Sequence, residues 1–367
     1  MTIKKILFVL SSMNIGGVEK SLLSLLSQIP QDEYDVTVLL LEKKGGFLEY
    51  LPKWVKEEEA EWFKDIKEII MQPPQTTIKN FIKNRNYIKA IRFGVIYFFS
   101  RNMENRYIYY KNILKEIPKC NNKYDIAISY AGPTEIIDSY VAKKVDAEKK
   151  VAWVHFDVIK HCINKKLYEG MYKSYNKIFA VSNEAKDKLI STISGIENKT
   201  ELFLNIICKD LINDMANEDQ DIKYDSSFTN IVTVGRLSKE KGQDLAIEAM
   251  RILKADGYKV RWYCVGEGNS RKEYENLIKK YGLEKEFILV GATPNPYPYI
   301  KNADLYVQTS RHEGYCLTLA EAKCLNKEII TTNFTGVNEQ IKIEADGIIV
   351  DFKKECMVRA IKERMNT

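Results

Sequence analysis

Short apolar runs alternate along the chain with segments whose apolar positions recur every three or four residues. The apolar runs predict strands, and the segments with helical spacing predict the helices between them. We expect strands at residues 6–10, 36–41, 126–130, 151–155, 178–181, 231–234, 261–265, 287–290, 305–308 and 328–332. We expect helices at residues 18–29, 183–193, 243–255, 271–281 and 352–365. The alternation predicts an α/β fold with parallel sheets covered by helices on both faces.

The domain junction is expected between residues 205 and 225, where the acidic stretch NEDQD lies in a segment of little apolar periodicity. A chain of 367 residues with 45% hydrophobic residues is long for one core, which favours two domains. We therefore expect an N-terminal domain over residues 1–207 and a C-terminal domain over residues 208–367.

Charge is concentrated in one segment, residues 76–123. Eleven basic and two acidic residues give it a net charge of +9, so the rest of the chain sums to −3 against a total of +6. Aromatic residues are interleaved with these cations, which suits a surface helix bound to an anionic membrane. The alternative is that the aromatics pack on the N-terminal sheet and the cations are solvated. No base-reading motif occurs, so we expect no nucleic-acid partner.

The cysteine pattern and the apolar runs indicate the compartment. Seven cysteines are scattered without a CxxC pair, which is typical of a reducing compartment. The apolar runs at residues 6–10 and 93–99 are too short for a signal-peptide core or a membrane span. We expect a cytoplasmic protein, peripheral on the inner face of the membrane if residues 76–123 bind lipid.

Candidate binding residues follow two of the expected strands. Gly16 and Gly17 lie between the first strand and a helix, where a backbone without side chains could approach a ligand. Arg236 and Lys241, in the loop VGRLSKEKG after the sixth strand, are suited to a diphosphate. Each feature also has an ordinary interpretation, as a tight connection or as solvated loop cations.

The segment SRHEGYCLTLAEA contains two carboxylates, Glu313 and Glu321, on either side of an apolar run. If both lay on one helix, their Cα atoms would be about 12 Å apart along its axis, which suits the two ends of one elongated ligand. We expect this helix to start at Gly314, so that backbone N–H groups near its start could bind an anion. These are the N–H groups of Gly314, Tyr315, Cys316 and Leu317. Either glutamate could instead be an ordinary helix residue.

One histidine is a further candidate, and no metal site is expected. His155 ends a strand and would face the ligand crevice of a parallel sheet, although many such histidines are structural. The three histidines have no metal-ligand spacing. Asp219 and Asp221 match a D-x-D motif by letters, but they lie in the acidic junction, so we interpret them as solvated. We expect neither a metal nor another cofactor.

Together these residues resemble the retaining glycosyltransferases of family 4, which have the GT-B fold. The resemblance runs over about residues 3–350 through SSMNIGGVEKSL, AWVHFD, VTVGRLSKEKGQDLAIEA and NADLYVQTSRHEGYCLTLAEA. It implies two Rossmann-like domains with parallel sheets facing across a cleft, an acceptor-side N-terminal domain and a donor-binding C-terminal domain. Family members usually continue beyond the helix at residues 352–365, whereas this sequence ends at Thr367.

The resemblance also implies roles for the candidate residues. The E-x7-E motif of the family corresponds to Glu313, beside the donor sugar, and Glu321, on the ribose. Arg236 and Lys241 would bind the diphosphate, and His155 with the Gly16-Gly17 loop would lie near the reacting sugar. UDP is the more frequent nucleotide in the family, GDP the less frequent, and no metal would be needed.

The sequence thus predicts a retaining, hexosyltransferase-like enzyme that moves a sugar from a nucleotide diphosphate to a glycan or lipid-linked saccharide in surface polysaccharide synthesis. Two alternatives remain open. One is a UDP-sugar epimerase within the same fold, and the other is a membrane- or nucleic-acid-binding protein with a degenerate sugar site.

Overall fold

The computed structural model describes residues 3–156, 158–159, 161–218, 222, 224–313, 315–334, 337–342 and 347–365. The chain divides into two compact units, Met1–Asn205 and Ile206–Thr367, and each contains its own hydrophobic core. The expectation of an α/β fold built on parallel sheets is confirmed in both units.

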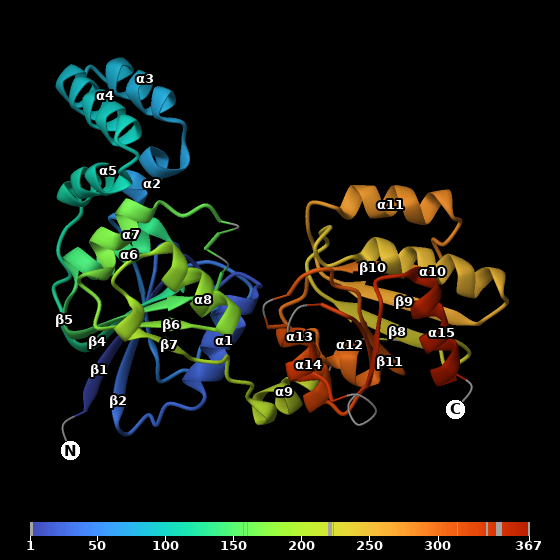
Figure 1. Ribbon diagram of the computed structural model, residues 1–367. Helices are drawn as coiled ribbons and strands as arrows, with labels where there is room; N and C mark the ends of the chain where they lie inside the picture. Colours follow the sequence, from blue (N-terminus) through green and yellow to red (C-terminus); the bar gives the residue numbers. More distant parts are fainter. Residues whose placement is uncertain are drawn as a thin grey trace. The chain divides into compact units, whose positions relative to one another are not determined.

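The N-terminal unit is built on a parallel sheet of seven strands in the order β3-β2-β1-β4-β5-β6-β7 (Figure 1). Their bounds are β1 Lys4–Leu10, β2 Tyr34–Leu40, β3 Lys56–Glu59, β4 Lys123–Gly132, β5 Asp146–Val154, β6 Lys177–Ala180 and β7 Thr200–Leu202. The pairing of Ile6 with Ile126 joins β1 to β4. Because β1 has a neighbour on each side and helices over both faces, its residues 6–10 are all buried, as the continuous apolar run predicted.

Eight α-helices belong to the described part of this unit. They are α1 Gly17–Leu26, α2 Phe63–Met71, α3 Pro74–Lys83, α4 Tyr87–Asn102, α5 Arg106–Ile113, α6 Glu135–Lys144, α7 Lys165–Tyr172 and α8 Asn183–Thr192. Helices α2 to α5 form one insertion between β3 and β4. Figure 1 shows α3 and α4 at the end of the unit that is farther from the sheet.

The C-terminal unit contains a parallel sheet of six strands in the order β10-β9-β8-β11-β12-β13. Their bounds are β8 Thr229–Val234, β9 Val260–Val265, β10 Phe287–Gly291, β11 Leu305–Gln308, β12 Glu328–Thr332 and β13 Ile348–Val350. The helices are α9 Lys209–Ala216, α10 Gln243–Ala255, α11 Arg271–Lys280, α12 Tyr297–Asn302, α13 Leu317–Cys324, α14 Val337–Gln340 and α15 Lys354–Met365.

The helices of the C-terminal unit pack in two groups. Helix α10 contacts α11 and α15, whereas α9 contacts α12 and α13. Figure 1 shows α10 and α12 on opposite faces of the sheet. The order of the strands reverses between β8 and β11, which are neighbours. In open parallel sheets, ligands bind beyond the carboxyl ends of the strands at such a reversal.

Residues 76–123 contain both buried and exposed apolar side chains. Phe93, Tyr109 and Tyr110 are buried in the core, with Phe81 and Tyr97 packed against it. Other apolar side chains of the same segment are exposed. No helix in the described ranges has the length and apolar character that crossing a membrane requires.

Candidate functional site in the C-terminal domain

The loops that follow β8 and β11 meet at the carboxyl end of the sheet, and each contributes a charged side chain. Lys241, from the first loop, donates through Nζ to Oε1 of Glu313, from the second, at 2.5 Å. Both are largely buried, with 26% and 10% of their side chains exposed. The structure therefore brings together two residues that are 72 positions apart in the sequence.

Glu313 is held by a chain of polar groups that begins in β11. Tyr306 donates its hydroxyl to Gln308 Oε1 at 2.6 Å, and Gln308 Nε2 donates to Ser310 Oγ at 2.7 Å. Ser310 Oγ then donates to Glu313 Oε1 at 2.6 Å. Because one carboxylate oxygen accepts from both Ser310 and Lys241, the position of this carboxylate is fixed from two sides.

Lys241 remains protonated in this environment. Burial of its ammonium group favours the neutral form, but the negative charge of Glu313 and the hydrogen bond to it outweigh that effect and raise the pKa of Lys241. Arg236 is exposed, and its charge acts on Lys241 in the opposite direction. Of the two cations expected to bind a diphosphate, only Lys241 is therefore largely buried.

Arg311 fixes the two loops to each other. Its guanidinium donates to both carboxylate oxygens of Asp244, at 2.8 and 2.5 Å, and its Cζ lies 4.2 Å from the ring centroid of Phe352. Arg311 Nη1 also donates to the carbonyl oxygen of Lys239 at 2.5 Å. A two-pronged pair of this kind sets orientation as well as distance, so Arg311 positions the loop that carries Glu313.

A glycine is required where the loop after β8 enters α10. Gly242 has φ +68°, and a Cβ there would lie 2.1 Å from the carbonyl oxygen of Thr309. Thr309 Oγ1 in turn donates to the carbonyl oxygen of Lys241 at 2.9 Å. This close approach of two backbones sets the distance between Lys241 and the loop after β11.

Glu321 lies inside α13 and does not share a helix with Glu313, which precedes that helix. Only 3% of the residue is exposed, and Oε1 accepts a hydrogen bond from the Tyr297 hydroxyl at 3.2 Å. Burial raises the pKa of Tyr297 well above its usual value, so this phenol stays a donor at neutral pH. No pattern in the sequence predicted that Tyr297 would lie beside Glu321.

The expected start of this helix at Gly314 is wrong. Helix α13 begins at Leu317, with Cys316 as the residue before it. The N–H of Cys316 donates to Gln340 Oε1 at 2.9 Å, and Gln340 Nε2 donates back to the Cys316 carbonyl at 3.1 Å. The amide that was expected to bind a ligand is thus satisfied by a side chain from α14. Tyr315 is half-buried in the loop before the helix.

Some of the sequence-based candidates lie outside the described residues. These are Gly314, Asp219, Gln220 and Asp221. Among the residues that are described, no group of three or more His, Cys, Asp or Glu side chains could hold a metal ion.

The N-terminal domain contains the remaining candidates. Gly16 precedes α1, and Gly17 is its first residue. A Cβ at Gly16 would meet only the flexible side chain of Glu19, so the backbone here does not depend on glycine for its fold. From α1, Ser21 Oγ lies 2.8 Å from the Tyr130 hydroxyl and donates to Asn205 Oδ1 at 2.7 Å.

His155 follows β5, and its ring centroid lies 4.8 Å from that of Tyr130. Burial lowers the pKa of His155 to about 3, and a hydrogen bond to the backbone of Tyr130 opposes this only in part. Its Nε2 is buried and has no hydrogen-bond partner among the described residues. At neutral pH this is an uncharged imidazole, suited to hydrogen bonding rather than to holding a positive charge.

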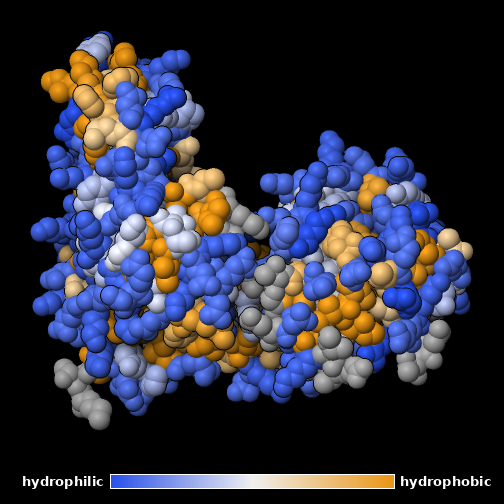
Figure 2. Space-filling model, in the orientation of Figure 1, coloured by the Kyte–Doolittle hydropathy of each residue, from blue (hydrophilic) through white to orange (hydrophobic). Residues whose placement is uncertain are grey.

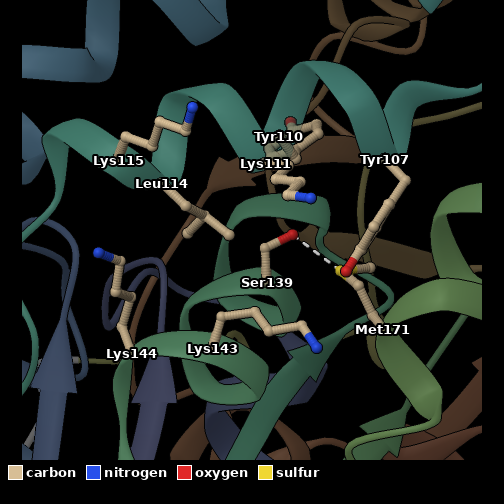
Figure 3. A pocket seen from close by; sticks show the side chains of 9 residues that line it. All are labelled: Tyr107, Tyr110, Lys111, Leu114, Lys115, Ser139, Lys143, Lys144 and Met171. Carbon is tan, nitrogen blue, oxygen red and sulfur yellow. Dashed lines mark hydrogen bonds between the residues drawn. The ribbon is translucent and has the colours of Figure 1, made fainter.

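A separate pocket of about 330 Å³ lies between α5 and the 3-10 turn that follows it, on one side, and α6 and α7 on the other. Figure 3 shows Lys111, Lys115, Lys143 and Lys144 around it, with Leu114 between them and Met171 beside Tyr107. Ser139 Oγ donates to Met171 Sδ at 2.8 Å. None of the candidate residues named above lines this pocket.

Sequence comparison identifies the C-terminal region. Residues 214–367 match the family described as glycosyl transferases group 1. The C-terminal domain belongs to this family. The polar network around Lys241 and Glu313 is therefore part of a group 1 glycosyl transferase domain.

Two curated relatives illustrate the relation. The N-acetylgalactosamine-N,N'-diacetylbacillosaminyl-diphospho-undecaprenol 4-alpha-N-acetylgalactosaminyltransferase of Campylobacter jejuni is 29% identical over 194 residues, covering 53% of this chain and 51% of the relative. The capsular polysaccharide biosynthesis glycosyltransferase CapM of Staphylococcus aureus is 27% identical over 195 residues, covering 48% and 49%. The chain spans about half the length of the curated relatives it matches.

The fold is that of the GT-B glycosyltransferases. The crystal structure of HepE from Anabaena, in complex with UDP and glucose, matches with a TM-score of 0.67 at 17% identity and covers 99% of this chain and 90% of HepE. The architecture that the resemblance implied, with two parallel-sheet α/β domains, is confirmed.

Proposed function

We propose that the protein transfers a sugar from a nucleotide diphosphate to a glycan or lipid-linked saccharide, with retention of anomeric configuration. The observation that carries the proposal is the buried pair of Lys241 and Glu313 at the carboxyl ends of neighbouring strands in a group 1 glycosyl transferase domain. The activities of these two relatives, capsular polysaccharide synthesis and transfer to a diphospho-undecaprenol-linked sugar, support surface polysaccharide synthesis as the setting.

The donor that we propose is a UDP-sugar in preference to a GDP-sugar. The fold relative HepE was crystallised with UDP and glucose, which supports this choice. In the proposed reaction the bond between the sugar C1 and the diphosphate oxygen breaks. The acceptor hydroxyl forms the new bond to C1 on the same face, and its proton passes to the departing diphosphate.

Positive charge is what this reaction needs most, because negative charge builds up on the leaving diphosphate. Lys241 and Arg236 would supply it, so we propose that neither a divalent cation nor another cofactor is required. Glu313 would orient the donor sugar, and Glu321 would bind the ribose. In the N-terminal domain, His155 and the loop of Gly16 and Gly17 would contact the reacting sugar. Backbone N–H groups of Gly314, Tyr315 and Leu317 would complete the donor site, without that of Cys316, which donates to Gln340.

The test is a panel of nucleotide sugars with lipid-linked and free glycan acceptors, scored by mass spectrometry of the product. We expect transfer from one UDP-sugar, with the α or β configuration of the donor preserved. Epimerisation or hydrolysis of the donor without transfer would contradict the proposal, as would complete loss of activity in EDTA that a divalent ion restores.

Substitution of each glutamate separates their roles. Glu313→Ala should chiefly lower turnover, and Glu321→Ala should chiefly weaken nucleotide binding. Near wild-type kinetics in both variants would remove the assignment of this site.

We further propose a cytoplasmic location at the anionic inner face of the membrane, with residues 76–123 as the contact and no nucleic-acid partner. This location would bring the enzyme to a lipid-linked acceptor.

A further inference from the structure

Helices α3 and α4 form a hairpin whose outer surface is apolar. Most of the exposed large hydrophobic side chains in the described part of the chain lie on this hairpin or beside it. Figure 2 shows hydrophobic residues gathered at this end of the N-terminal domain. The side chains that form the surface are Ile82, Ile88, Ile91, Val95, Phe98 and Phe99.

Helix α4 has two apolar faces instead of one. Its inner face buries Ala90, Phe93 and Ser100, and the ring of Phe93 lies 5.8 Å from those of Phe81 and Tyr109. A surface helix normally places polar residues on the opposite face. Here the opposite face holds the exposed apolar residues, so packing within the protein does not account for them.

The exposed residues of α4 form a continuous stripe. At 100° per residue, Ile88, Ile91, Val95, Phe98 and Phe99 fall within about 100° of the helix circumference. The stripe is about 16 Å long, from the rise of 1.5 Å per residue. Ile88 is 84% exposed and Ile91 69%. Single exposed apolar residues are ordinary, but a contiguous patch of this kind indicates an interaction surface.

The charges around the stripe indicate what kind of surface it meets. Lys79, Lys83 and Arg85, on α3 and in the turn, are exposed. Within the described ranges none of these three forms an ion pair, whereas Lys89 and Arg92 both approach Glu116. Four more lysines line the pocket under α5, and α5 contacts α4. A second copy of the chain would bring like charges together, whereas an anionic lipid surface would neutralise them.

We propose that the α3–α4 hairpin inserts the apolar stripe of α4 into the headgroup boundary of an anionic bilayer while its cations bind lipid phosphates. Helix α4 has 16 residues, fewer than a membrane span needs, and lies along the interface. This proposal rests on the proposed membrane contact of residues 76–123. It specifies which element makes that contact and that apolar side chains enter the bilayer, which adsorption by charge alone does not require.

The test is sedimentation of the full chain with vesicles of phosphatidylcholine containing 30 mol% phosphatidylglycerol, about the composition that gives a strongly anionic surface. Donor and acceptor are absent, so the result does not depend on the proposed reaction. UDP binding, measured by calorimetry on the same samples, reports separately on the sugar-nucleotide site.

Two variants separate the contribution of the apolar side chains to vesicle binding from that of the cations. Ile91→Gln/Phe98→Gln should lower the vesicle partition coefficient at least about tenfold, at low and at high salt, because it removes apolar area that the bilayer buries on insertion. Lys83→Gln/Arg85→Gln should lower it about fivefold for each cation at low salt and have little effect at 1 M salt, where screening is strong. Ile3→Gln, which replaces an exposed isoleucine (56%) outside the hairpin, should change nothing.

Circular dichroism and thermal unfolding of each variant confirm that it is folded. Binding that disappears in 1 M salt and is unaffected by Ile91→Gln/Phe98→Gln would show adsorption by charge alone and overturn insertion. Absence of binding by the wild type would overturn the membrane contact altogether. A dimer in sedimentation equilibrium that Ile91→Gln/Phe98→Gln dissociates, without vesicle binding, would assign the stripe to a second copy and also overturn it.

Discussion

Lys241 and Glu313 illustrate how much a single residue's role depends on its partner. The two side chains neutralise each other in a largely buried site, so removing one leaves the other as an unpaired buried charge. The energetic effect of a substitution here therefore includes the behaviour of the residue that remains.

This coupling leads to a prediction about diphosphate binding. Lys241→Ala should weaken UDP binding at least about tenfold, and more than Arg236→Ala, because it leaves the Glu313 carboxylate unpaired where a diphosphate would bind. Uridine binding should change little in either variant. The measurement is calorimetry with UDP and uridine.

The controls use the same loop and the same pair. Lys239→Ala removes an exposed lysine (79% of the side chain) from this loop and should leave UDP binding unchanged. Adding Glu313→Gln to Lys241→Ala should restore part of the lost UDP affinity. Equal UDP affinity in wild type and Lys241→Ala would contradict the diphosphate assignment.

The pKa of His155 gives a second prediction at this scale. An imidazole with a folded pKa of about 3 and an unfolded value of about 6.5 takes up its proton only on unfolding. This group therefore contributes stability that is fully present above about pH 6.5 and is lost progressively as the pH falls toward 3.

The measurement is the pH titration of the three histidine ring signals by NMR. We expect the His155 signals to stay those of a neutral ring from pH 8 to pH 5. In His155→Gln the unfolding free energy should fall less steeply between pH 6.5 and pH 5. A titration of His155 near pH 6.5 would show that the ring is hydrated.

At the residue scale, the sequence indicated which residues belong to the site better than it indicated which residues contact them. Lys241 was chosen as a cation in a loop after an expected strand, and Glu313 as one of two carboxylates on either side of an apolar run. Both follow strands of one parallel sheet, whose carboxyl ends lie at the same edge. Their supporting residues, Ser310 and Gln308, are buried polar side chains at the end of β11. Only their polar character inside an apolar region could have indicated them. Gln340 and Tyr297 come from other elements, and no local pattern predicts contacts across a fold.

At the scale of elements, the long periodic segments were predicted well. Helix α10 has the expected bounds, Gln243–Ala255, and β11 and β12 agree as well. Strands β3, β7 and β13 were missed. Strand β3 reads KEEE and has no apolar pattern, and β7 and β13 have only three residues each. The start of α13 was misplaced because Gln340, distant in sequence, binds the backbone of Cys316.

The connection into α10 gives a prediction with an internal control. Gly242→Ala should lower the melting temperature of the C-terminal domain, because it combines a positive φ with a Cβ that would overlap the Thr309 carbonyl. Gly257→Ala tests the first cause alone, since Gly257 has φ +81° but nothing within 4 Å of a Cβ.

The expected cost is about 1 kcal/mol for Gly257→Ala and about 3 kcal/mol or more for Gly242→Ala, measured by denaturant unfolding. UDP binding should also weaken in Gly242→Ala alone, since the displaced loop carries Lys241. Equal losses of stability in the two variants would mean that the contact with Thr309 contributes nothing.

At the scale of the whole molecule, the chain contains two cores that do not share residues. The acidic, weakly periodic segment was the basis for expecting a junction between residues 205 and 225, because a domain boundary changes composition over many residues. The two compact units are Met1–Asn205 and Ile206–Thr367. The position of each domain's helices in space was not predictable in this way, since it depends on packing.

The separate cores predict that residues 206–367 fold without the N-terminal domain. This fragment should unfold cooperatively and bind UDP within about threefold of the full chain, but it should not transfer sugar. Saturation with UDP at 100 times its Kd should raise the free energy of unfolding of the fragment by about 2.7 kcal/mol. Thermal scans of the fragment with and without UDP provide the measurement. A fragment that is unfolded, or that UDP does not stabilise, would contradict the prediction.

The register of the N-terminal sheet has a consequence for protein synthesis. Strand β1 is central, yet its partner β4 pairs Ile126 with Ile6, about 120 residues away. At roughly 5–20 residues per second during translation, one edge of β1 has no partner strand for several seconds. The residues of α3 and α4 are made within that interval. An open strand edge and an apolar helix stripe are thus exposed on the same nascent chain, and aggregation competes with folding most strongly at that stage.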